Sequence, residues 1–312
     1  MPPFIEARHI RKVFTTGGGL FGDDKQTVAV DDFSLEIDPD KPSFTAIAGE
    51  SGSGKTTIAR MLLGFIPPSS GQVLYKGNDL GDLEKDEMRS FRQDVQAIFQ
   101  DPFEVYNPFY KVDHVLTTPI EKFGLASSQS EAREQIDVAL RTVGLRPEET
   151  LGRYPHQLSG GQRQRITIAR ALLLKPKLII ADEPVSMVDA SLRATILDSL
   201  HKLHSDFNIS FVYITHDLTT AYQVSEQIVV LYHGNVVEAG DVEKVIRDPQ
   251  HPYTRELISS IPMPNPGNSW IEKDIELYDP SKTDEILQRE GWSKDAEGFW
   301  NRDGERLTMR KK

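Results

Sequence analysis

The chain has 312 residues, of which 38% are hydrophobic and 27% charged, a composition ordinary for a soluble globular protein of one large or two smaller domains. Its formal net charge of -11 argues against a general nucleic-acid-binding protein, which needs a basic face. The absence of cysteine excludes disulfides, iron–sulfur clusters and thiolate zinc sites, and no stretch approaches the roughly 20 apolar residues of a membrane helix.

The N-terminal part predicts two strands. Residues 1–8 lack the apolar core of a signal peptide. Strands are expected at residues 5–14 and 27–37, and the second alternates apolar and polar residues, which is typical of a half-buried strand. Phe14 comes just before a glycine-rich segment. It is either a routine core residue or a ring that stacks on an adenine.

The next segment carries the strongest motif in the chain. Residues 49–56 read Gly-Glu-Ser-Gly-Ser-Gly-Lys-Thr and fit the phosphate-loop pattern G-x-x-x-x-G-K-[ST], between an apolar strand expected at residues 44–48 and a helix at 57–63. The glycines let backbone N–H groups surround a phosphate at the positive end of the helix. Lys55 would reach the β- and γ-phosphates, and the Thr56 hydroxyl would bind Mg2+. The alternative is a glycine turn with a solvated lysine. The expected nucleotide-binding residues here are Gly49, Glu50, Ser51, Gly52, Ser53, Gly54, Lys55, Thr56 and Thr57.

The middle of the chain changes from strands to helices. Strands are expected at residues 72–75 and 95–99, separated by turns. From about residue 112 to 149 the apolar residues have helical spacing, which we interpret as a helical insertion within the α/β domain.

The third part alternates helices and strands. A helix is expected at residues 166–174, a buried strand at 178–183, a helix at 192–205 and a strand at 209–215. Two further strands flank His233-Gly234, which predicts a hairpin turn. This alternation indicates a largely parallel sheet.

Two more constellations could bind phosphate or metal. Asp182 and Glu183 close an apolar strand, where Asp182 would hold Mg2+ through its water shell and Glu183 would activate the attacking water. The alternative is a pair of solvated carboxylates.

A second potential anion site lies at the start of a helix and would cap a nucleotide bound by another subunit. It consists of Ser159, Gly160, Gly161 and Gln162. The alternative is an ordinary helix N-cap.

Together these motifs resemble the nucleotide-binding domain of an ABC transporter over about residues 4–262. Gln100 stands at the Q-loop glutamine, residues 158–162 at the signature loop, residues 178–183 at the second nucleotide motif, residues 186–189 at the D-loop, and His216 at the switch histidine. The resemblance implies an α/β P-loop NTPase with a mostly parallel core sheet, an antiparallel β subdomain and a helical subdomain at about residues 112–175. We expect this domain to span residues 1–262, with a C-terminal extension at 263–312.

The resemblance also implies roles and ligands. ATP and Mg2+ would be the cofactors, with two ATP molecules held between phosphate loop and signature loop in a head-to-tail dimer. Gln100 would approach Mg2+ and couple the site to membrane subunits, Glu183 would be the base, and His216 would contact the γ-phosphate. Phe14 matches the adenine-stacking aromatic and Asp189 the D-loop aspartate. Met187 and Val188 depart from the usual Ala and Leu, which leaves the D-loop's coupling in doubt.

A subfamily is indicated by the C-terminal part. Residues 251–254, His-Pro-Tyr-Thr, resemble the C-terminal segment of oligopeptide and dipeptide importer ATPases, and the Q-loop segment resembles their second (F-type) ATPase. This implies an ATPase at the cytoplasmic face of the cell membrane, paired with a related second ATPase subunit, two permease subunits and an extracytoplasmic solute-binding protein, without nucleic acid. Relatives with this segment serve peptides, sugars or nickel, so the solute stays open. Residues 105–108 depart from the usual Ser-Leu-Asn-Pro and would face the permease.

Two other classes of function are possible. A soluble ABC ATPase of DNA repair or ribosomes would have no permease, but it usually carries two cassettes or a long coiled-coil insertion, which this chain lacks. A regulatory ATP binder without turnover is the third class, and the presence of Glu183 and His216 argues against it.

The C-terminal extension predicts a small appendage. A short helix is expected from Ser281 to about Gly291, and a hairpin around Asp303-Gly304. Its three aromatic residues, Trp292, Phe299 and Trp300, need a surface to cover them. A disordered tail is the alternative.

Overall fold

The computed structural model describes residues 2–16, 25–101, 105–261, 293–294, 300–302 and 305–306. The chain divides into two units, residues 1–258 and 259–312. None of the helices in these described ranges is long and apolar enough to cross a membrane.

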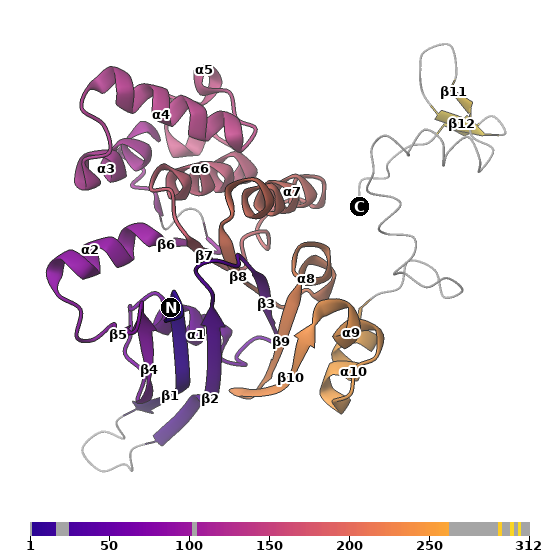
Figure 1. Ribbon diagram of the computed structural model, residues 1–312. Helices are drawn as coiled ribbons and strands as arrows, with labels where there is room; N and C mark the ends of the chain where they lie inside the picture. Colours follow the sequence, from indigo (N-terminus) through magenta and orange to yellow (C-terminus); the bar gives the residue numbers. More distant parts are fainter. Residues whose placement is uncertain are drawn as a thin grey trace. The chain divides into compact units, whose positions relative to one another are not determined.

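A ten-stranded sheet organises the first unit (Figure 1). In sheet order its strands are β5 (Asn78–Asp79), β4 (Ser70–Tyr75), β1 (Ile5–Thr16), β2 (Lys25–Ile37), β10 (Asn235–Asp241), β9 (Gln227–Tyr232), β3 (Phe44–Ala48), β8 (Ser210–Thr215), β7 (Leu178–Asp182) and β6 (Val95–Ile98). The strands β6, β7, β8, β3 and β9 pair in parallel, whereas β2, β1, β4 and β5 pair antiparallel. The predicted parallel core with an antiparallel part is therefore confirmed.

The central strands are buried on both faces. Every residue of β3 and β8 is buried, and β7 is buried except at Asp182. Parallel strands covered on both faces need nearly continuous apolar runs, which is what these segments contain. By contrast β2 buries Val30, Phe33 and Ile37, half-buries Leu35 and exposes Asp31, Asp32, Ser34 and Glu36. It is half-buried as predicted, but irregular pairing with β1 interrupts the strict alternation.

Helices connect the strands. They are α1 (Lys55–Leu62), α2 (Lys85–Asp94), α3 (Asp113–Phe123), α4 (Gln129–Thr142), α5 (Pro147–Thr150), α6 (Gly160–Leu173), α7 (Ala190–Phe207), α8 (Leu218–Val224), α9 (Val242–Arg247) and α10 (Pro252–Ser259), with a 3-10 turn at Pro155–Gln157. Helices α3, α4, α5 and α6 pack on one another and lie together in Figure 1. The sequence predicted α1, α3, α4, α6 and α7 but not α2, α8, α9 or α10.

Two predicted hairpins are present. The β9–β10 pair turns at His233 and Gly234, whose φ angles of 47° and 81° are both positive, as a type I′ turn requires. In the second unit β12 (Trp300–Arg302) pairs antiparallel with β13 (Glu305–Arg306), and β11 (Ser293–Lys294) adds a third strand that was not predicted. The helix predicted from Ser281 lies outside the described residues.

Candidate functional site

The carboxyl ends of four parallel strands bring the motif residues together. Ala48 of β3 pairs with Thr215 of β8, so the phosphate loop (residues 49–56) and His216 leave the sheet side by side. Asp182 of β7 pairs with Ile214, and Gln100 follows β6, the next strand. Ligands of open α/β sheets bind at this edge, because the loops that leave the strands there converge.

A pocket of about 540 Å³ opens at this edge, and we call it the phosphate-loop pocket. It is lined by Ala29, Glu50, Ser51, Gly52, Gly54, Lys55, Thr56, Thr57, Gln100, Glu183, His216 and Leu257. The side chains expected to act on a γ-phosphate, Lys55, Glu183 and His216, therefore share one cavity. Gln100 and Thr56 also line an adjoining pocket of about 360 Å³, where they meet Asp182.

Lys55 is held against its own loop. Its Nζ donates to the carbonyl oxygens of Gly49 and Glu50, each at 2.7 Å. Burial lowers the pKa of Lys55, and the carboxylates of Glu183, Asp182 and Glu50 offset part of this effect. The bonds to the two carbonyls satisfy the buried ammonium group, and an anionic phosphate in the pocket would be a stronger partner than a neutral carbonyl.

Glu183 has an unusual backbone conformation. Its φ angle of 46° lies in the left-handed region, which is rare for a residue other than glycine. Three bonds hold it there: its N–H donates to the carbonyl of Ile214 at 2.9 Å, and its own carbonyl accepts the N–H of Ser186 at 3.2 Å and the Ser186 hydroxyl at 3.0 Å. Its Oε1 lies 2.9 Å from Nδ1 of His216. A non-glycine residue in this conformation costs of the order of 1–3 kcal/mol, and such strain concentrates at functional sites.

Oxygen atoms suited to magnesium lie beside the loop. The Thr56 side chain hydrogen-bonds to Asp182. Burial raises the pKa of Asp182 and the charge of Glu183 adds to this, while Thr56, Lys55 and Arg60 oppose it. Within the described residues no three acidic or histidine side chains gather as a closed metal site. An open set of one carboxylate and one hydroxyl fits Mg2+, which usually keeps several waters and takes its other ligands from substrate phosphates.

Several predicted residues lie elsewhere. The described residues that line the phosphate-loop pocket include neither Phe14, nor Asp189, nor any of Ser159, Gly160, Gly161 and Gln162. Phe14 is 43% exposed on β1. Gly49 and Ser53 belong to the phosphate loop but are not among the lining residues, and the Ser53 carbonyl accepts the N–H of Gly234.

The signature loop (residues 158–162) is capped by its own side chains. Ser159 Oγ accepts the N–H of Gln162 at 3.2 Å, and Gln162 Oε1 accepts the N–H of Ser159 at 2.9 Å. This reciprocal capping box is the ordinary N-cap that was the alternative to an anion site. None of the residues of this loop lines the phosphate-loop pocket of its own chain.

The sequence did not predict Ala29 of β2, which lines the phosphate-loop pocket, or two further residues near it. Leu257 lines the phosphate-loop pocket, and the hydroxyl of Tyr253 accepts the N–H of Glu50 at 3.0 Å. Both lie on α10. The sequence signal was the segment at residues 251–254, which indicated a subfamily and nothing about the nucleotide.

Comparison with known proteins agrees with this geometry. Residues 30–186 match the family model "ABC transporter", and residues 237–285 match "Oligopeptide/dipeptide transporter, C-terminal region". The chain is 40% identical to the oligopeptide transport ATP-binding protein OppF of Escherichia coli K12, over 78% of this chain and 70% of that protein. It is 38% identical to the di/tripeptide transport ATP-binding protein DppF of Pseudomonas aeruginosa UCBPP-PA14, over 90% and 86%.

A solved structure resembles most of the chain. The ATP-binding cassette MJ0796, described as dimeric in a post-hydrolysis state with ADP and Pi, aligns with a TM-score of 0.66 and 29% identity, over 76% of this chain and 98% of that chain. The chain belongs to the ABC transporter family and carries the magnesium- and ATP-dependent ATPase cassette of that family.

Proposed function

We propose that the chain is the ATP-hydrolysing subunit of an importer that moves oligopeptides or dipeptides through separate permease subunits, at the cytoplasmic face of the membrane. The observation that carries the proposal is the meeting of Lys55, Glu183 and His216 in one pocket beside Thr56 and Asp182. The peptide substrate is supported by the names of the relatives and by the matching C-terminal region. These names do not favour a soluble ATPase of DNA repair or ribosomes.

The residues divide the chemistry between them. Backbone N–H groups of the phosphate loop and Lys55 bind the phosphates. Thr56, Asp182 and Gln100 would hold Mg2+, which would supply positive charge beside the γ-phosphate. Glu183 accepts the proton of the attacking water. His216, 2.9 Å from the Glu183 carboxylate, orients that carboxylate and contacts the γ-phosphate.

Each site is completed by a second ATPase subunit. The signature loop and Asp189 lie outside the phosphate-loop pocket of their own chain, and Phe14 is exposed on β1. A head-to-tail dimer with a related ATPase subunit would place the signature loop of one chain over the phosphate loop of the other.

Replacement of the proposed base tests the ATPase assignment. Glu183→Gln keeps the size of the side chain and removes the carboxylate, so turnover in the assembled complex should fall by roughly 10²–10⁴ while ATP still binds. Glu134→Gln makes the same chemical change on the exposed face of α4 and should leave turnover as it is. Equal turnover in Glu183→Gln and the unmodified chain would refute the assigned base.

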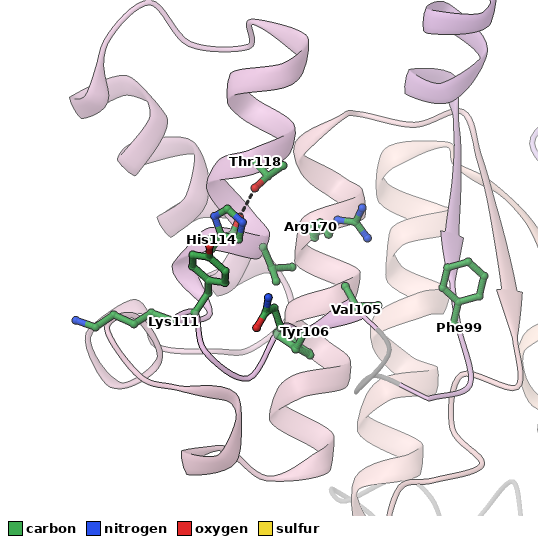
Figure 2. Close-up of a pocket in the computed structure, with 10 residues that line it drawn as sticks. Phe99, Val105, Tyr106, Lys111, His114, Thr118 and Arg170 are labelled. Carbon is green, nitrogen blue, oxygen red and sulfur yellow. Dashed lines mark hydrogen bonds between the residues drawn. The ribbon is translucent and has the colours of Figure 1, made fainter.

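A second pocket supports a permease contact. Figure 2 shows this cavity of about 470 Å³, with Lys111 and His114 on one side and Phe99 on the other. Its described lining residues carry basic groups and no carboxylate, although the whole chain has a net charge of -11. Residues 105–107, expected to face the permease, contribute to it, and Tyr106 is fixed there by donating its hydroxyl to the carbonyl of Arg163 at 2.9 Å.

Charge reversal tests this contact. Lys111→Glu with His114→Glu should reduce co-purification of the permease subunits from solubilised membranes, because an acidic segment of the permease would no longer be attracted. Lys122→Glu, at the other end of α3, is the matched control. If both proteins retain the permease equally, the contact lies elsewhere.

A further inference from the structure

Helix α10 reaches the phosphate loop through one face. Tyr253 accepts the N–H of Glu50 with its hydroxyl at 3.0 Å, and Leu257, one turn later, lines the phosphate-loop pocket. Residues four positions apart lie on the same side of a helix. Helix α10 thus forms part of the pocket wall, although it belongs to none of the nucleotide-binding motifs.

Tyr253 is itself held firmly. The residue is 7% exposed, and its ring packs on Tyr232 of β9 with centroids 4.2 Å apart. Glu238 of β10 accepts the N–H groups of Gln250 at 2.8 Å and His251 at 3.0 Å, just before α10 begins. The start of α10 is therefore fastened to the β9–β10 hairpin, and the hydroxyl of Tyr253 has a defined position.

Both the backbone N–H and the backbone carbonyl of Glu50 are hydrogen-bonded. Its carbonyl accepts Nζ of Lys55 at 2.7 Å and the N–H of Ser53 at 3.2 Å, and its N–H goes to Tyr253. Lys55 can exchange that carbonyl for a phosphate, which is the stronger acceptor. The bonds to Ser53 and Tyr253 do not depend on Lys55, so they can keep Glu50 in place when the lysine moves.

We propose that Tyr253 is a positioning residue that holds Glu50, and through it the phosphate loop, in the conformation that binds ATP. The inference rests on the nucleotide site proposed above. A loop fixed before binding loses less conformational entropy when the ligand arrives, which strengthens binding. The segment at residues 251–254 thereby links the C-terminal region to ATP affinity.

Removal of one oxygen atom tests the proposal. In the full-length chain, Tyr253→Phe should weaken Mg-ATP binding, measured by titration calorimetry, by roughly two- to tenfold, as expected for the loss of one hydrogen bond. Without any nucleotide, hydrogen–deuterium exchange of the Glu50 amide should become faster, because its acceptor is gone. Tyr232→Phe removes the hydroxyl of the neighbouring ring and should change neither measurement.

A variant that lacks the donor completes the test. Glu50→Pro removes the N–H that Tyr253 accepts, so adding Tyr253→Phe to it should weaken ATP binding no further. The proposal is overturned if Tyr253→Phe leaves the ATP affinity unchanged, if Tyr232→Phe weakens it equally, or if the two changes add in full. Failure of the unmodified chain to bind ATP would instead reject the nucleotide site itself.

Discussion

The chain has two glycine-containing loops that precede a helix, and they are built in opposite ways. The phosphate loop enters α1 at Gly54, whose φ of 106° is left-handed and which has no side-chain cap. The signature loop enters α6 at Ser159, in extended conformation, with a complete capping box. The N-terminus of α1 therefore has no side-chain cap, whereas the capping box satisfies N–H groups at the N-terminus of α6.

The space around one glycine of each loop also differs. A Cβ on Gly54 would lie 2.3 Å from the carbonyl oxygen of Ala29, which is main chain and cannot move aside. A Cβ on Gly160 would meet nothing closer than the Met187 carbonyl oxygen at 3.8 Å. Gly54 of the phosphate loop is therefore confined by the strand beside it, whereas Gly160 of the signature loop has free space around it.

The largest effect is expected for Gly54→Ala. The left-handed φ and the clash with Ala29 should together lower the free energy of unfolding by about 3 kcal/mol, measured by urea denaturation. Gly52→Ala is the control, because Gly52 also has a positive φ, 83°, but its Cβ would have no neighbour within 4 Å. It should cost about 1 kcal/mol from backbone strain alone. Equal losses would show that the packing around Gly54 is unimportant.

Ser159→Ala should have a smaller effect. Loss of the acceptor for the Gln162 N–H should cost about 1 kcal/mol in the same denaturation experiment. Ser159→Asp retains an acceptor and should recover most of it. Neither change should alter the ATP affinity of the single chain, because Ser159 does not line the phosphate-loop pocket; a weakened affinity would contradict the separation of the two loops.

Gly161→Ala is expected to cost about 0.5 kcal/mol. Its Cβ would lie 2.8 Å from Cδ1 of Leu192, a flexible side chain that can shift, and the better helix propensity of alanine offsets part of the crowding. Thermal unfolding with and without the additional change Leu192→Ala separates these contributions. A loss that persists when Leu192 is truncated would mean that the crowding has another source.

Gly160→Ala should leave the free energy of unfolding within about 0.5 kcal/mol of the unmodified chain, because the added methyl group meets only an ordinary contact. Its effect should be confined to turnover in the proposed dimer, where a partner's nucleotide would approach the loop. A large loss of stability in the isolated chain would show that the signature loop is packed as tightly as the phosphate loop.

The sequence predicted secondary structure best where a local residue pattern is compatible with only one conformation. The apolar runs predicted β3, β7 and β8, and His233-Gly234 predicted the type I′ hairpin. The missed helices have weaker signals: α2 buries only Phe91 among its residues and is capped by Glu84 and Glu87, not by serine or threonine. Helices α8 and α9 are short, with seven and six residues.

The amino-acid sequence by itself determined the phosphate loop, the carboxylates after β7 and the family, because these depend on residue types at fixed spacing. Only the tertiary structure decided which residues share a pocket, since this depends on the order of strands in the sheet. It also decided the left-handed conformation of Glu183 and the bond between Tyr253 and Glu50, two residues 203 positions apart. No local pattern encodes such a contact, because it arises only when α10 is fastened to a hairpin that lies beside the loop.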